Sequence, residues 1–116
     1  MQVRILIARM PRLLTDVVSA ILVREADMLV VARLDSQVDL AASVRALRPD
    51  VVVLLEDGQP MMGDHASLFA EHAALRVITV AGDQGISALY RSGERPALMR
   101  GPSAAQFVAA VRGSAP

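Results

Sequence analysis

The chain of 116 residues has no cysteine and no tryptophan, and its aromatic side chains are limited to one tyrosine and two phenylalanines. Without cysteine it cannot form disulfides, use a thiol nucleophile or hold a metal through thiolates. With so few aromatics, a core must be built mainly from Val, Leu, Ile, Ala and Met. The length suits one domain that buries a single core without disulfides or a structural metal.

Lysine is also absent, so all twelve basic residues are arginines, and they balance twelve acidic residues. This excludes a lysine Schiff base or general base, and a neutral chain lacks the basic excess typical of non-specific nucleic-acid binding. No apolar run approaches the ~20 residues needed to span a bilayer, and the charged first turn lacks a signal-peptide cleavage pattern. We therefore expect a cytoplasmic protein without contact to a membrane. We identify no residue pattern for a cofactor.

Short apolar runs alternate with amphipathic stretches along the chain. The runs predict strands at Val3–Ala8, Met28–Ala32, Val51–Leu55, Arg76–Val80 and Pro96–Met99. The stretches between them predict helices at Pro11–Arg24, Ser36–Leu47 (with Ser36 as the cap), Asp64–Ala73, Ile86–Arg91 and Ala104–Arg112. Five strand–helix units in a row predict a doubly wound parallel α/β sheet with right-handed crossovers. We expect one domain over residues 1–113, with 114–116 as the start of a tail or linker.

The third predicted strand ends in two carboxylates. The run from Val51 to Leu55 is uniformly apolar, which is typical of a parallel strand that is covered on both faces. Glu56 and Asp57 follow it directly. Open α/β sheets place their sites at the carboxyl ends of the strands, so this pair is a candidate site.

Several of these segments resemble the receiver domains of response regulators, closest to those that precede helix-turn-helix domains in transcription factors. Arg4–Ala8 is similar to the first receiver strand, and Pro11–Val31 to the first helix and second strand. Arg45–Val52 resembles the start of the third strand, and Pro60–Gly63 the loop after the phosphorylation site. The resemblance implies a flavodoxin-like (βα)5 fold with five parallel strands in the order 2-1-3-4-5.

The first two active positions depart from the receiver pattern. Where the family has an acidic pair that holds Mg²⁺ through oxygen ligands, this chain has Arg9 and Met10. Arginine only donates hydrogen bonds and cannot ligate a cation. The phosphoacceptor position falls on Glu56 when counted from the following proline, and on Leu55 when counted from the start of the strand. Asp57 becomes the acceptor if the strand slips by one residue.

The remaining active positions also differ. The hydroxyl residue that ends the fourth strand of receivers corresponds to Ala81, although Thr79 lies two residues earlier. The lysine of the family maps onto Arg100, and the aromatic that reports phosphorylation maps onto Ala97. Because phosphoryl transfer to an aspartate needs both a metal and a well-placed carboxylate, we expect a degenerate pocket that works without phosphorylation.

Two interpretations of this pocket remain open. In the first, Glu56 reaches Arg9 and Arg100 and forms an internal salt bridge that mimics a phosphorylated aspartate. In the second, Glu56 and Asp57 are solvated loop acids, whose exposed ion pairs contribute only about 0–1 kcal/mol.

A partner surface is expected on the fourth helix, fifth strand and fifth helix, which often form the dimer or effector interface of receivers. Its candidate residues combine apolar anchors with charges of both signs: Tyr90, Arg91, Glu94, Arg95, Arg100 and Phe107. Tyrosine and arginine are enriched in interface hot spots. A homodimer or another partner protein could bind there.

Other candidates for chemistry are weaker. His65 and His72 lie seven residues apart on a predicted helix, without a third metal ligand, and no nucleophile–base pair is evident. We therefore predict a non-enzymatic signalling or dimerisation module of a transcriptional regulator, which contacts DNA only through a separate output domain. The alternatives are a receiver-like sensor that binds a small-molecule effector in the degenerate pocket, and a stand-alone adaptor.

Overall fold

The structure is a computed structural model that describes residues 2–34, 40–56, 66–81, 86–95, 97–100 and 103–113. In these ranges the elements are, in chain order, β1 (Val3–Ala8), α1 (Arg12–Val23), β2 (Met28–Leu34), α2 (Leu40–Leu47), β3 (Val51–Glu56), α3 (Ala66–Glu71), β4 (Arg76–Ala81), β5 (Ile86–Arg91), β6 (Ala97–Arg100) and α4 (Ala104–Arg112). None of these helices combines the length and the apolar character needed to cross a bilayer.

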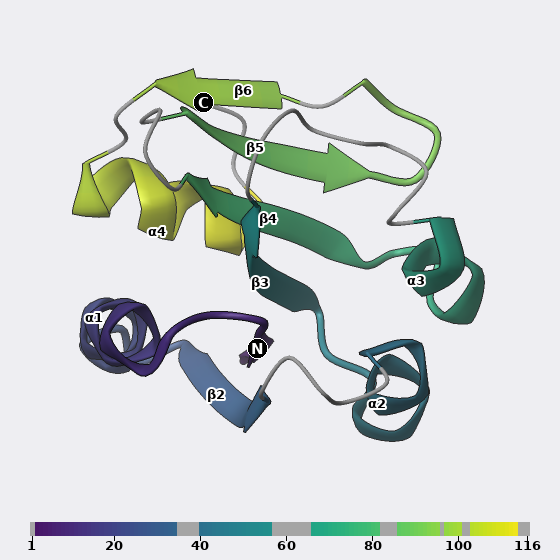
Figure 1. Ribbon diagram of the computed structural model, residues 1–116, viewed down its shortest axis with the longest axis horizontal. Helices are drawn as coiled ribbons and strands as arrows, with labels where there is room; N and C mark the ends of the chain where they lie inside the picture. Colours follow the sequence, from purple (N-terminus) through teal and green to yellow (C-terminus); the bar gives the residue numbers. More distant parts are fainter. Residues whose placement is uncertain are drawn as a thin grey trace.

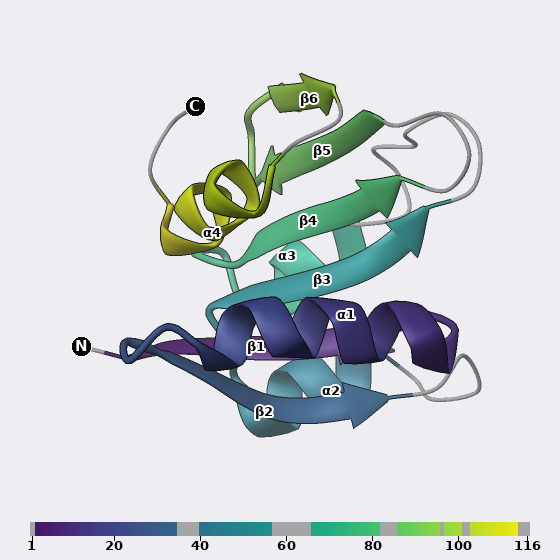
Figure 2. The ribbon, with the colours of Figure 1, turned by 90° about the vertical axis from the view of Figure 1, so that its left-hand side faces the viewer.

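One six-stranded sheet runs through the molecule in the order β2-β1-β3-β4-β5-β6. The pairs from β2 to β4 are parallel, whereas β5 is antiparallel to both of its neighbours. The arrows in Figure 2 show β5 pointing against β3, β4 and β6. The prediction of an α/β fold is confirmed. The predicted sheet of five parallel strands differs from the observed one, which has six strands and an antiparallel β5.

The extra strand comes from a segment for which we predicted a helix. The prediction of a helix over Ile86–Arg91 is wrong, because this segment is β5 and pairs Tyr90 with Val77 and Ala88 with Thr79. A short apolar run fits a strand and a buried helical turn equally well. Pairing along β4 decides between them, and a turn at Gly93, with a φ of +77°, leads from β5 into β6.

The helices cover both faces of the sheet and give three layers (Figure 1). Helices α1 and α4 cover one face, where the core includes Val18, Leu22, Ile5, Val53, Ile78, Phe107 and Val111. Helices α2 and α3 cover the other face, where it includes Leu40, Val44, Leu68, Leu6, Val52, Val77 and Tyr90. Successive residues of β3 enter opposite cores, as the alternation of side chains in a strand requires.

Local signals explain the ends of the helices. Ser103 caps α4 in a capping box with Gln106, and Gly113 ends the helix with a φ of +88°. This is the left-handed region that glycine enters at no steric cost. Pro11 precedes the first residue of α1, where its missing N–H needs no partner. The predicted bounds of β1 and α4 are confirmed, and those of α1 differ by one residue at each end.

Some predictions lie outside the described residues. They are the cap at Ser36, the acidic residue Asp57, the loop Pro60–Gly63 and the histidine at position 65. For Glu56 the structure gives the backbone in β3.

Candidate functional site

The carboxyl ends of β1, β3, β4 and β6 lie at one edge of the sheet, where the degenerate pocket is predicted. The register pairs Ala8 with Leu54 and Glu56 with Ala81. Across β5 it pairs Ile86 with Arg100. The backbones of Arg9, Glu56, Ala81 and Arg100, which the sequence assigns to one pocket, therefore all lie at this edge of the sheet.

The inserted strand changes the spacing along this edge. Three strand intervals separate β3 from β6, which is about 14 Å at 4.7–4.9 Å per interval. The predicted five-stranded order leaves only two intervals between Glu56 and Arg100. A salt bridge between these residues must therefore span one strand more than the phosphate-mimic hypothesis assumed.

Arg9 follows β1 in a left-handed conformation, with a φ of +55°. Its side chain is exposed, while Met10 is half-buried and packs against the core under α1. A positive φ is uncommon for residues other than glycine, so the chain turns sharply where the resemblance to receivers places the family's acidic pair. The structure thus presents the cationic side chain of Arg9 to solvent at the carboxyl end of β1.

Thr79 has a structural role in the fold. It is buried, and its hydroxyl oxygen accepts the N–H of Ala88 at 3.1 Å. This bond fixes β5 against β4, and a buried N–H left without an acceptor would cost about 1–3 kcal/mol. The hydroxyl is engaged within the sheet and does not face the carboxyl edge.

Two residues of the predicted partner surface belong to the core. Tyr90 is 1% exposed and Phe107 is 7% exposed, and they pack in the cores on opposite faces of the sheet. Neither can serve as a surface anchor, and the segment that contains Tyr90 is a strand instead of the expected helix. Glu94, Arg95 and Arg100 are exposed. Ala97 begins β6 and lies half-buried against the α1 side of the core.

Arg91, the remaining residue of that surface, is used within the fold. It lies opposite Arg76 in the β4–β5 pair, at the end of the sheet remote from Arg9. The two guanidinium groups donate to carbonyls at the C-terminus of α4, from Arg76 to Val111 at 2.7 Å and from Arg91 to the capping residue Gly113 at 2.9 Å. Burial, followed by the charge of Arg91, lowers the pKa of Arg76. Arginines at a helix C-terminus are favoured by the helix dipole.

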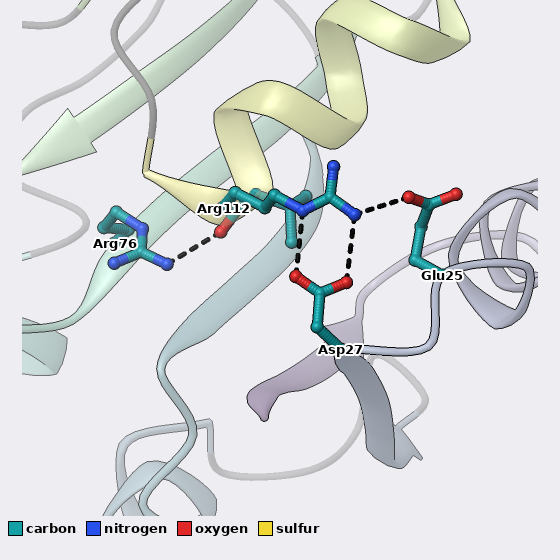
Figure 3. Close-up of polar contacts among 5 residues, drawn as sticks. Glu25, Asp27, Arg76 and Arg112 are labelled. Atoms are coloured by element: carbon teal, nitrogen blue, oxygen red, sulfur yellow. Dashed lines mark hydrogen bonds and ion pairs between the residues drawn. The ribbon is translucent and has the colours of Figure 1, made fainter. Parts of the chain in front are cut away.

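A second polar cluster joins α4 to the turn after α1 (Figure 3). Arg112 donates to both carboxylate oxygens of Asp27, at 2.9 and 3.0 Å, and to the carboxylate of Glu25. Arg112 is 85 positions from Asp27 and 87 positions from Glu25 in the sequence, so only the tertiary fold brings them together. The hydrogen bond from Arg112 holds the pKa of Asp27 below its ordinary value.

This lowered pKa predicts a loss of stability in acid. A group whose pKa is lower in the folded state stabilises the fold above the unfolded pKa, near pH 4 for Asp, and loses that contribution as the pH falls through the folded pKa. The free energy of unfolding should therefore drop between about pH 5 and pH 2.

In the variant Arg112→Met the drop in the free energy of unfolding should be smaller, as measured by urea unfolding at several pH values. Arg95→Met, at an exposed position, is the control. Equal drops in wild type and Arg112→Met would contradict the prediction.

The outer face of α1 exposes three large apolar side chains. Leu13 and Val23 are 77% and 76% exposed, and Val17 is 50% exposed although its helical spacing predicts a buried position. A groove of about 590 Å³ runs between α1 and α4, with Ile21 and Val108 in its lining. Sequence reasoning missed this exposed face. Leu13 and Val23 lie on a different side of the helix from the buried residues Val18 and Leu22, and this spacing could have indicated it.

The described residues offer little for metal or acid–base chemistry. They contain no group of three or more His, Asp and Glu residues that could hold a metal ion. His72 directly follows α3, and its backbone N–H donates to the carbonyl of Leu68. Comparison of the chain with protein-family models, curated proteins and solved structures finds no significant match.

Proposed function

We propose that this domain is a non-enzymatic, receiver-like interaction module of a signalling or transcription-regulating protein, and that it acts without phosphorylation. The observation that carries the proposal is the exposed apolar face of α1, with Leu13, Val17 and Val23 on a helix that is anchored to the sheet. Large exposed apolar patches mark interaction sites on soluble proteins. The resemblance of the sequence to receivers supplies the signalling context.

The carboxyl edge of the sheet supports the part of the proposal that concerns phosphorylation. Transfer of a phosphoryl group to a carboxylate needs a cation that bridges the phosphate oxygens. Arg9 stands where the metal-binding acids of receivers are expected and adds a fixed positive charge. A guanidinium cannot supply the coordination geometry of Mg²⁺. The edge therefore favours a domain whose state is set by binding to another protein.

Intact mass spectrometry after incubation with acetyl phosphate and Mg²⁺ tests this proposal. We expect the mass of the chain to stay unchanged, because no acidic pair recruits the metal. A receiver domain with an intact acidic pair, treated in parallel, should gain the mass of one phosphoryl group. If this chain gains that mass as well, and Asp57→Asn abolishes the gain, the phosphorylation-independent function is wrong.

A further inference from the structure

The charges on the exposed face of α1 are complementary to those of a second, antiparallel copy of the same helix. Asp16 and Arg24 lie four residues before and four residues after Ala20, which places both on the face of Ala20, one turn to either side. All three are exposed, and Val17 and Val23 lie three residues to either side of the same alanine. Two such helices in antiparallel orientation, crossing at Ala20, bring unlike charges together at both ends.

Asp16 and Arg24 cannot satisfy each other within one chain. They are eight residues apart, which is about 12 Å along a helix at 1.5 Å per residue. The side chain of neither residue forms an ion pair or hydrogen bond with another residue of the described ranges. Their charges are thus available to a partner, unlike those of Glu25 and Arg112, which are already paired.

The surface around Ala20 is shaped to receive a helix. Ala20 lines the groove between α1 and α4, and also a second hollow of about 740 Å³ between α1 and β2. Val17 borders the first hollow and Val23 the second. Helices pack by placing the side-chain ridges of one into the grooves of the other, and small side chains at the contact allow the axes to approach closely. The small side chain of Ala20, between two hollows, would allow a second helix to pack closely here.

The geometry points to a second copy of this chain as the partner. Two α1 helices pack antiparallel across a twofold axis at Ala20, with Asp16 of each copy paired to Arg24 of the other and Val17 opposite Val23. Such an interface is isologous, as in most homodimers, because the same patch serves both subunits. The inference rests on the proposed interaction function and names the partner for the α1 face.

Charge reversal tests this arrangement by sedimentation velocity across a concentration series. Asp16→Arg and Arg24→Asp each place like charges opposite one another twice, so each should raise the dimer dissociation constant about tenfold or more. The double variant Asp16→Arg/Arg24→Asp exchanges the charges and should restore the wild-type constant. An equimolar mixture of the two single variants should form the heterodimer, because both of its contacts are then attractive.

The control is Arg12→Asp, a charge change of the same size on α1 that has no acidic partner in this register. It should leave the dimer intact, and circular dichroism should show wild-type helix content for all variants. A monomeric wild type, single variants that dimerise like wild type, a double variant that stays monomeric, or dissociation of Arg12→Asp would each overturn the inference. A monomeric chain whose mass is unchanged by acetyl phosphate would leave the proposed function standing, with a different partner.

Discussion

Tyr90→Ala should lower the free energy of unfolding by about 3–5 kcal/mol, as truncation of a fully buried aromatic does. Tyr90 is 1% exposed and lies in the core between the sheet and helices α2 and α3. The cost combines the lost burial of the ring with the cavity that remains, and a loss of this size is a large part of the 5–15 kcal/mol that stabilises a typical domain. Urea unfolding followed by circular dichroism measures it.

Arg95→Ala is the matched control for Tyr90→Ala, since Arg95 is exposed and was assigned to the same surface by the sequence. We expect it to change the free energy of unfolding by no more than about 0.5 kcal/mol. If both variants behave alike, with losses below about 1 kcal/mol, the residue at position 90 is at the surface. The strand assignment of β5 would then be wrong.

Leu22→Ala should lower the free energy of unfolding by about 2–5 kcal/mol. Leu22 is 0% exposed, on the face of α1 that packs against the sheet. Alanine is the best helix former, so the loss reports packing and cavity formation rather than a weaker helix. The same urea titration measures this loss.

Leu13→Ala removes the same atoms from the opposite face of the same helix. Because Leu13 is 77% exposed, the expected change is within about 0.5 kcal/mol. Both variants should be measured at a concentration at which the chain is monomeric, since association adds apparent stability by mass action. A loss above about 2 kcal/mol for Leu13→Ala would show that this side chain is already covered within the monomer. The free apolar face of α1 would then not exist.

The segments that could be predicted are those whose sequence pattern is compatible with only one type of secondary structure. The strand at Val3–Ala8 and the helix at Ala104–Arg112 were predicted with their observed bounds. The first is a short apolar run before a helix start, and the second has a serine cap and a terminal glycine. Such signals act within a few residues of each other, so the sequence alone carries them.

The segment Ile86–Arg91 shows where sequence patterns stop being sufficient. Its apolar residues are compatible with a helical turn or a strand, and the choice depends on β4, which offers Val77 and Thr79 as pairing partners. The buried hydroxyl of Thr79 accepts the N–H of Ala88 and adds to that choice. Nothing within the segment itself specifies these partners.

The predicted site also has a part that the sequence shows and a part that depends on the tertiary structure. The sequence places Arg9, Ala81 and Arg100 near the ends of strands, and the parallel topology brings those ends to one edge. The distance along the edge depends on the strand order, which the inserted β5 changes. The cluster of Arg112 with Asp27 and Glu25 could not be predicted, because ion pairs between residues so far apart have no sequence periodicity.

The sequence by itself determined the absence of thiol and lysine chemistry, the α/β organisation and the arginine that follows the first strand. Composition excludes chemistry directly, and hydrophobic periodicity acts over single turns and strands. The tertiary structure alone decided that the sheet has a sixth strand, that Tyr90 and Phe107 are core residues, and that Leu13 and Val23 remain exposed. Burial depends on which elements cover one another, and that is settled only when the whole chain packs.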